Sequence, residues 1–149
     1  MTVAMASLAA FSVDLPLPDR LLSPNAHVHW TDKARVTKGA RKLAWYWFQR
    51  CKPAKWEPVP IVLTVLYRYG PGQDGYRPRD VQNAIASLKP SIDGMVDAGI
   101  VPDDSAKWVQ WGGVQLVKCI KGETPVVRVT ITRAGESTAK QALAGNGGS

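Results

Sequence analysis

Apolar and polar side chains alternate near the start of the chain, over Phe11–Pro18 (FSVDLPLP). Alternation with a period of two is typical of a half-buried strand, and Pro16 and Pro18 would end its pairing. We therefore expect a first strand that runs into an extended loop. The residues that follow, 19–39, are mostly polar and include the turn sequence Ser23-Pro24-Asn25, so they predict a loop.

A helix is expected from about Thr37 to Cys51. Leu43 and Trp47 are i, i+4 neighbours there, and the pair Lys52-Pro53 would end the helix. The next apolar run, residues 60–70 (PIVLTVLYRYG), is rich in β-branched and aromatic side chains. This composition predicts a central strand.

The segment 77–105 has its apolar residues at helical spacing. They are Val81, Ala84, Ile85, Leu88, Ile92, Met95 and Val96. Pro90 interrupts this pattern, so either one helix kinks there or a second helix begins with Pro90 in its first turn. Gly99 is expected to cap the end of the helical region.

Two further strands are expected in the last third of the chain, within residues 107–122 and 125–134, around a turn near Gly122–Thr124. The resulting order, β-α-β-α-β-β, predicts an α+β fold in which the helices lie on one side of the sheet. The length of 149 residues fits one domain, which we place at 1–133. Residues 134–149 are small and polar and predict a disordered tail.

The chain carries a formal net charge of +7 and a sequence pI near 9.7. Such a surplus favours a polyanionic partner, usually nucleic acid, although a solvated basic surface is the simpler alternative. No stretch approaches the ~20 apolar residues of a membrane span, and the N-terminus lacks the basic start of a signal peptide. A cytoplasmic location in a bacterial or phage-infected cell is expected, with Cys51 and Cys119 as buried free thiols.

Five of the twelve acidic residues gather between Arg77 and Ser105. They are Asp80, Asp93, Asp97, Asp103 and Asp104, with Lys89 among them. If the two ends of this segment converge, paired carboxylates would suit a hard cation such as Mg²⁺, which prefers oxygen ligands and phosphate. Alternatively, the same residues could form a helix N-terminus, a solvated helix face and a turn.

The ordered set D-x-x-N, K-P-x-x-D-G-M and A-G-x-x-x-D-D resembles the signature of the RusA family of Holliday junction resolvases. The residues that carry the resemblance are Arg79, Asp80, Asn83, Lys89, Asp93, Ala98, Gly99, Asp103 and Asp104. It covers about Val13 to Thr132. The family implies a small mixed β-sheet with two main helices packed on it, a homodimer, and Mg²⁺-dependent cleavage of four-way DNA junctions in recombination and repair. It implies no small-molecule cofactor and no membrane partner.

By position, the resemblance makes Asp80 and Asp104 the catalytic metal ligands, with Asp103 beside them. Lys89 corresponds to the family's active-site lysine, which would neutralise charge building on the phosphate. Gln82 stands where the family usually has a second aspartate, so an uncharged amide oxygen would take that place and Mn²⁺ could substitute for Mg²⁺. Lys89 also lies three residues further from Asn83 than the family pattern has it. A DNA-binding protein of the same fold without cleavage activity is the alternative.

Basic residues gather in the segment 33–56, which contains eight Lys and Arg and no acid. The expected DNA contacts are Lys33, Arg35, Lys38, Arg41 and Lys42, together with Arg77 and Arg79 beside Asp80. Trp45, Trp47 and Trp56 are interleaved; we expect them in the core, with base stacking as the alternative. His27 and His29 would form a zinc pair only with further ligands that are not apparent.

Overall fold

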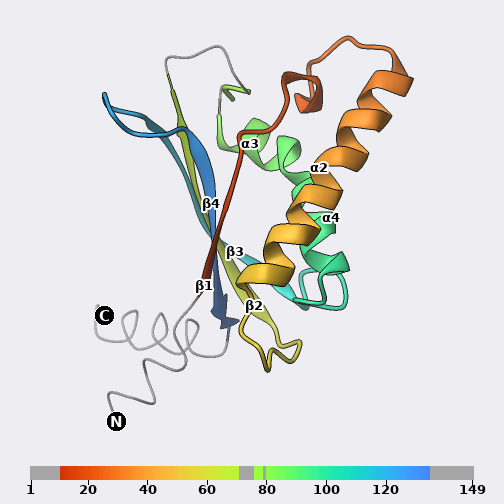
Figure 1. Cartoon of the computed structure of the whole chain (residues 1–149), viewed down its shortest axis with the longest axis vertical. Helices are drawn as coiled ribbons and strands as arrows, with labels where there is room; N and C mark the ends of the chain where they lie inside the picture. The colour runs from red at the N-terminus through yellow and green to blue at the C-terminus, as the bar shows by residue number, and fades with distance from the viewer. Residues whose placement is uncertain (1–10, 71–75, 79, 135–149) are drawn as a thin grey trace, which may run out of the picture.

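The computed structural model describes residues 11–70, 76–78 and 80–134 (Figure 1). In chain order its elements are β1 (Phe11–Leu15), the 3₁₀ turn η1 (Arg20–Leu22), α2 (Trp30–Cys51), β2 (Ile61–Tyr69), α3 (Val81–Ser87), α4 (Lys89–Asp97), β3 (Val109–Lys118) and β4 (Val126–Arg133). The expected order of strands and helices and the α+β class are confirmed. The tail predicted at 134–149 lies outside the described residues from 135 onward.

The four strands form one mixed sheet in the order β1-β4-β2-β3. β2 pairs in parallel with β3 and antiparallel with β4, and β1 pairs antiparallel with β4. β2 is therefore central, as its apolar run predicts. The last two strands are not a hairpin, because β2 lies between them. The connection turns at Gly122, whose φ of 94° favours glycine, and the amide of Glu123 donates to the carbonyl of Ile120 at 3.1 Å.

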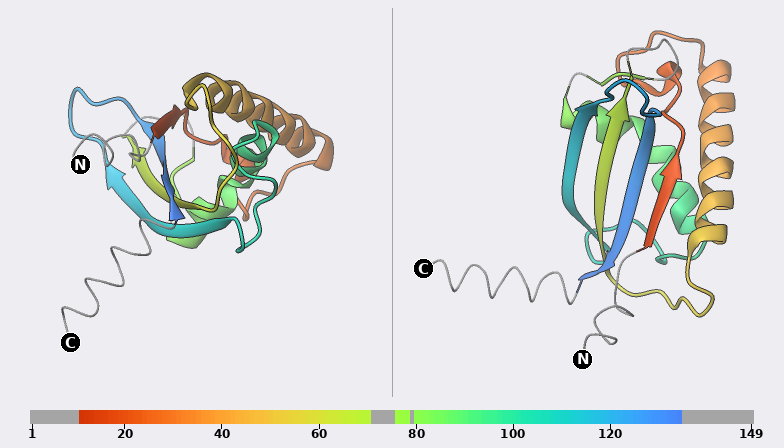
Figure 2. Two further views of the ribbon diagram at one scale, coloured as in Figure 1. Left: turned by 90° about the horizontal axis from the view of Figure 1, so that it is seen from below. Right: turned by 60° about the vertical axis from the view of Figure 1, so that its left-hand side comes forward.

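The helices cover one face of the sheet, and the core lies between the two layers (Figure 2). Its largest fully buried side chains include Tyr67 and Leu63 of β2, Phe48 of α2 and Met95 of α4. Each side chain of this size stabilises the fold by about 1.5–3 kcal/mol relative to leaving it exposed. In the described part of the chain, no helix is long and apolar enough to cross a bilayer.

α2 begins at Trp30, earlier than expected, and so replaces much of the predicted loop at 19–39. The ring nitrogen Nδ1 of His29 caps the helix by accepting the amide of Thr31 at 3.2 Å. Residues 30–35 are all exposed. They carry no apolar face, and therefore the hydrophobic periodicity that revealed the later turns could not reveal this end of the helix.

The two helices of the acidic segment are separate. Leu88 is both the C-cap of α3 and the N-cap of α4, and Pro90 lies in the first turn of α4. The expectation that a second helix begins with Pro90 in its first turn is therefore confirmed. α4 ends before Gly99, whose φ is 84°, and the amide of Gly99 donates to the carbonyl of Val96 at 2.9 Å.

Gly94 lets α4 lie against the backbone of α2. A Cβ atom at this position would stand 2.3 Å from the carbonyl oxygen of Arg41 and 2.8 Å from the Cβ of Ala44. Ala44 and Phe48, one turn apart, form the buried row of α2. The expectation of core tryptophans is wrong for Trp45 and Trp47, which flank this row and stay 39% and 38% exposed.

Of the two cysteines, Cys119 is buried as expected and Cys51 is exposed, at the last turn of α2. Trp56 is half-buried, and its indole nitrogen donates to the carbonyl of Ile100 at 2.9 Å. This bond ties the segment after α2 to the segment after α4. Lys52 makes a second tie, from its ammonium to the carbonyl of Ala98 at 2.9 Å.

Candidate functional site

Lys89 brings two carboxylates of the acidic segment together. Its ammonium donates to Asp93 Oδ1 at 3.0 Å, one turn along α4, and to Asp104 Oδ2 in the loop beyond the helix. These hydrogen bonds, first to Asp104 and then to Asp93, raise the pKa of Lys89 above its ordinary value. The site is open, because the side chain of Lys89 is 58% exposed and that of Asp104 is 40% exposed. Its charges are therefore within reach of a ligand.

Two buried residues anchor the loop that carries Asp103 and Asp104. Ile100 and Val101 insert into the core with 0% and 1% exposure, so the following residues emerge at the surface. Oδ1 of Asp103 accepts the amide of Ser105 at 2.8 Å, which closes a turn. The hydrogen bonds to Ser105 lower the pKa of Asp103. Asp103 thus shapes the loop, whereas Asp104 faces Lys89.

Asp80 begins α3, as expected. It is the N-cap, and its Oδ1 accepts the amide of Asn83 at 2.8 Å. The cap uses one carboxylate oxygen and does not require Oδ2. Gln82 is exposed in the first turn of the same helix. α3 contacts both α4 and β3, so the helix that starts at Asp80 neighbours the strand that follows the Asp103–Asp104 loop.

Asp97 is not part of this site. Arg41 donates from Nε to Asp97 Oδ2 at 2.6 Å and from Nη2 to Asp97 Oδ1 at 2.9 Å. The two residues thus form a bidentate ion pair between α2 and α4. The hydrogen bond to Arg41 lowers the pKa of Asp97. Arg41, expected on the DNA surface, is therefore engaged within the protein.

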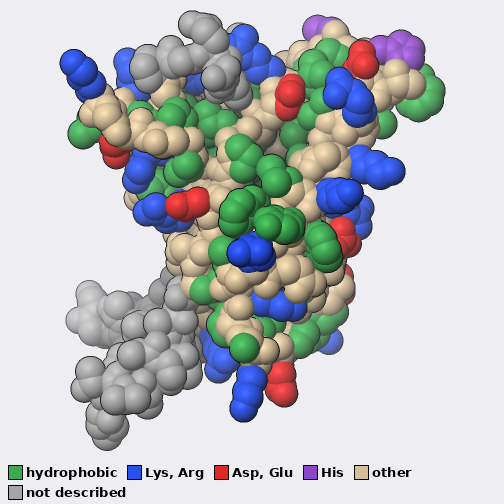
Figure 3. Space-filling view, in the orientation of Figure 1, with side chains coloured by type: hydrophobic (Ala, Val, Ile, Leu, Met, Phe, Trp, Pro, Cys, Tyr) green, Lys and Arg blue, Asp and Glu red, His purple; other side chains and the backbone are tan. Residues whose placement is uncertain are grey.

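The other α2 residues expected to contact DNA, namely Lys33, Arg35, Lys38 and Lys42, are exposed. Lys and Arg side chains accompany α2 on the face shown in Figure 3. Arg77 is also exposed and lies over the ring of Tyr69, with its guanidinium carbon 5.0 Å from the ring centroid. Arg79 lies outside the described residues.

Residues that the sequence did not single out hold the segment before Asp80. The hydroxyl of buried Tyr67 on β2 donates to the carbonyl of Tyr76, and burial raises the pKa of Tyr67. The amide of Tyr76 donates to the carbonyl of Pro18 at 2.7 Å. These bonds anchor residues 76–78 to the sheet and to the loop after β1. A tyrosine at an inward strand position is the only signal the sequence offers for them.

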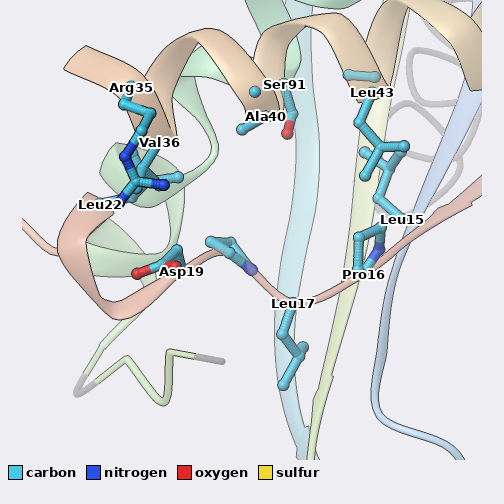
Figure 4. Close-up of a pocket in the computed structure, with 13 residues that line it drawn as sticks. Leu15, Pro16, Leu17, Asp19, Leu22, Arg35, Val36, Ala40, Leu43 and Ser91 are labelled. Atoms are coloured by element: carbon cyan, nitrogen blue, oxygen red, sulfur yellow. The ribbon is translucent and has the colours of Figure 1, made fainter. Parts of the chain in front are cut away.

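A hollow of about 310 Å³ lies between α2 and the loop after β1 (Figure 4). Its wall is mainly apolar, from Leu15 and Leu17 on one side and Val36 and Leu43 on the other. Arg35 also lines it. No residue of the Lys89 site borders this hollow, so the two features are separate.

The carboxylates of Asp80, Asp103 and Asp104 are oxygen donors, which a hard cation prefers. Within residues 11–70, 76–78 and 80–134, no three His, Cys, Asp or Glu side chains are grouped closely enough to hold a metal ion. One or two carboxylates together with substrate phosphate are the usual Mg²⁺ set, so the donors present fit such an ion. His29 already uses Nδ1 to cap α2.

Comparison with known proteins gives a partial likeness. A protein of Xylella fastidiosa (strain Temecula1), described as uncharacterized, is 37% identical over 91 residues. The match covers 58% of this chain and 56% of that relative, so the chain spans about half the relative's length. No family model matches the chain.

Proposed function

We propose that the protein is a Mg²⁺-dependent, structure-selective endodeoxyribonuclease that cuts four-way DNA junctions, similar to the RusA family. The observation that carries the proposal is the contact of Lys89 with Asp93 and Asp104. It unites the K-P-x-x-D-G-M and D-D parts of the motif in one open, charged site on a protein of net charge +7.

Each residue of the site has a distinct part in the proposed reaction. Asp80 and Asp104 would hold the cation, with Asp103 and Gln82 adjacent, and the ion when bound would polarise the phosphodiester and lower the pKa of water. Lys89 supplies a positive charge beside the carboxylates, where it offsets the charge that develops on the phosphate. Lys33, Arg35, Lys38 and Lys42 would bind the phosphates of the DNA arms.

A homodimer fits this task, because a four-way junction presents two symmetric strands for paired cuts. Exposed apolar side chains on β3 and beyond it are available for an interface: Trp111 is 37%, Val117 40% and Ile120 71% exposed. Sedimentation of the purified chain, alone and with a junction, tests this part. A 16.2 kDa particle without DNA, and one chain per junction in the complex, would exclude the paired-cut mechanism.

A second candidate is a branched-DNA-binding protein without cleavage activity. Two observations favour it: the uncharged Gln82 in the first turn of α3, and the ammonium of Lys89 on the Asp104 carboxylate. Both reduce the negative charge available to a cation. The two candidates predict the same DNA affinity and differ only in strand scission.

The test is incubation of the protein with a labelled four-way junction and, separately, with a linear duplex of the same sequence, with and without Mg²⁺. The proposal predicts nicks in the junction only, and only with the metal. Junction binding without nicks, in Mg²⁺ and in Mn²⁺, would favour the second candidate. Equal affinity for junction and duplex would contradict both.

A further inference from the structure

The N-terminal end of α2 extends beyond the packed part of the molecule (Figure 1). Its buried residues, Ala44 and Phe48, belong to the second half of the helix, whereas residues 30–35 are all exposed. The 22 residues of α2 span about 33 Å, and its first six residues, more than one full turn, are exposed. This end of the helix is available to a ligand.

A stacked aromatic pair stands at the start of this free end. The rings of His29 and Trp30 have centroids 5.8 Å apart and planes inclined by 27°. Trp30 is 74% exposed, more than any other large hydrophobic residue of the described chain. His29 covers one side of the indole, and the degree of exposure leaves the other side open to solvent.

The stack is held in place by the cap of α2. His29 Nδ1 accepts the amide of Thr31 at 3.2 Å and lies 2.6 Å from the Thr31 hydroxyl. An amide can only donate, so Nδ1 is the acceptor in this cap. The cap fixes the orientation of the imidazole, so the His29 ring covers one face of the Trp30 indole in the protein without ligand.

The charge around the pair indicates the kind of ligand. Lys33 lies one turn from Trp30, and Arg35, Lys38 and Lys42 continue along the exposed part of α2, against the single acid Asp32. Both histidines of the chain lie at the same end, with basic side chains further down the helix (Figure 3). An open aromatic face beside a row of cations is the arrangement that binds single-stranded nucleic acid, through base stacking and phosphate contacts.

We propose that Trp30, backed by His29, is a stacking site for an unpaired nucleobase, and that Lys33 contacts the phosphate of the same strand. This inference rests on the proposed function in taking DNA as the ligand. It adds a contact to unpaired bases, such as those at a branch point or a single-stranded end. The site lies on α2 and uses none of the residues assigned to the Lys89 site.

The probe is a short oligothymidylate with one 2-aminopurine, whose fluorescence falls when the base stacks on an aromatic ring. We expect the protein to quench this fluorescence and Trp30→Ala to weaken binding about 5- to 150-fold, the range for one base stack. Trp30→Phe should keep most of the affinity because it keeps an aromatic face. Tyr46→Ala, which removes an exposed aromatic ring from the second half of α2, is the matched control and should bind like the parent.

The salt dependence separates stacking from charge. Trp30 is neutral, so Trp30→Ala should lower the affinity at every salt concentration and leave the slope unchanged, whereas Lys33→Ala should reduce the slope by about 0.7 on a single strand. A changed slope in Trp30→Ala would contradict stacking. Thermal unfolding of each variant checks the fold, which substitution of so exposed a side chain should leave intact.

The outcomes distinguish this inference from the proposed function. If Trp30→Ala binds the oligonucleotide as the parent does while the parent cuts junctions, the stacking site is wrong and the nuclease proposal stands. If the parent binds no DNA, both fail. If Trp30→Ala instead abolishes a concentration-dependent self-association of the parent without affecting DNA binding, the indole is an interface for a second copy and the inference is overturned.

Discussion

Lys89 and Asp104, which are 15 residues apart in the chain, form an ion pair that closes the loop after α4 onto the first turn of that helix. The pair is exposed, so its contribution to stability is small, about 1 kcal/mol or less. The pair joins the first turn of α4 to the loop that carries Asp103 and Asp104. We therefore expect the site to tolerate substitution without unfolding.

The first prediction separates function from stability at Lys89. Lys89→Met should leave the thermal midpoint within a few degrees of the parent, because an exposed pair stabilises little. Junction cleavage should fall by at least ~100-fold, as expected for the loss of a group that stabilises transition-state charge. Lys121→Met, at an exposed turn, is the control and should cleave normally. A cleavage rate unchanged in Lys89→Met would exclude a catalytic part for this lysine.

The second prediction concerns the two glycines that lie within helices. Gly94→Ala should destabilise the protein by about 1–3 kcal/mol, because its Cβ would overlap the carbonyl oxygen of Arg41. Gly39→Ala is the matched control: nothing lies within 4 Å of its Cβ, so it should stabilise α2 by about 0.5–1 kcal/mol. Urea unfolding of both variants measures the difference. Equal effects would mean that α2 and α4 are further apart than described.

The third prediction concerns the pH dependence of the Arg41–Asp97 ion pair. The pKa of Asp97 is lowered in the folded state, so its contribution is fully present above the ordinary carboxyl value of 3.8 and is lost as pH falls through the lower folded value. Asp97→Asn should therefore cost stability near neutral pH and progressively less at a pH well below 3.8. Urea unfolding at both pH values tests this, with exposed Glu57→Gln as control. A cost that is the same at both would show that the pair does not form.

Much of the fold follows from patterns that packing leaves in the sequence. β2 and the apolar face of α3 and α4 are visible because their side chains face the core. The first turns of α2 are not, because nothing covers them. The position of β2 between β3 and β4 also escapes sequence reasoning, since adjacency along the chain suggests a hairpin and only the sheet as a whole decides the order.

The candidate site is predictable in part. Asp80 at a helix start and the Lys89–Asp93 spacing of four residues are local features, and both are present. The pairing of Arg41 with Asp97 spans 56 residues and depends on how closely two helices approach, which Gly94 decides. For that reason the sequence placed Arg41 on the DNA surface, whereas the structure uses it to join α2 to α4.

The fourth prediction concerns Gln82. Its amide is exposed in the first turn of α3, two residues after Asp80. Gln82→Asp should lower the Mg²⁺ concentration needed for half-maximal cleavage, because Mg²⁺ favours anionic oxygen ligands. The control is Gln110→Asp, on β3. If Gln82→Asp needs the same or more Mg²⁺, Gln82 does not stand in for a missing ligand.

The central claim is that Asp80 and Asp104 form a cleavage site for branched DNA, and single-turnover cleavage of a four-way junction tests it most directly. Asp80→Asn and Asp104→Asn should each abolish nicking, while gel-shift affinity for the junction stays equal or rises, because removing negative charge does not weaken phosphate binding. Asn keeps the helix cap at position 80, so α3 should remain intact. Glu57→Gln should nick at the parent rate. Nicking by either aspartate variant at the parent rate would contradict the account.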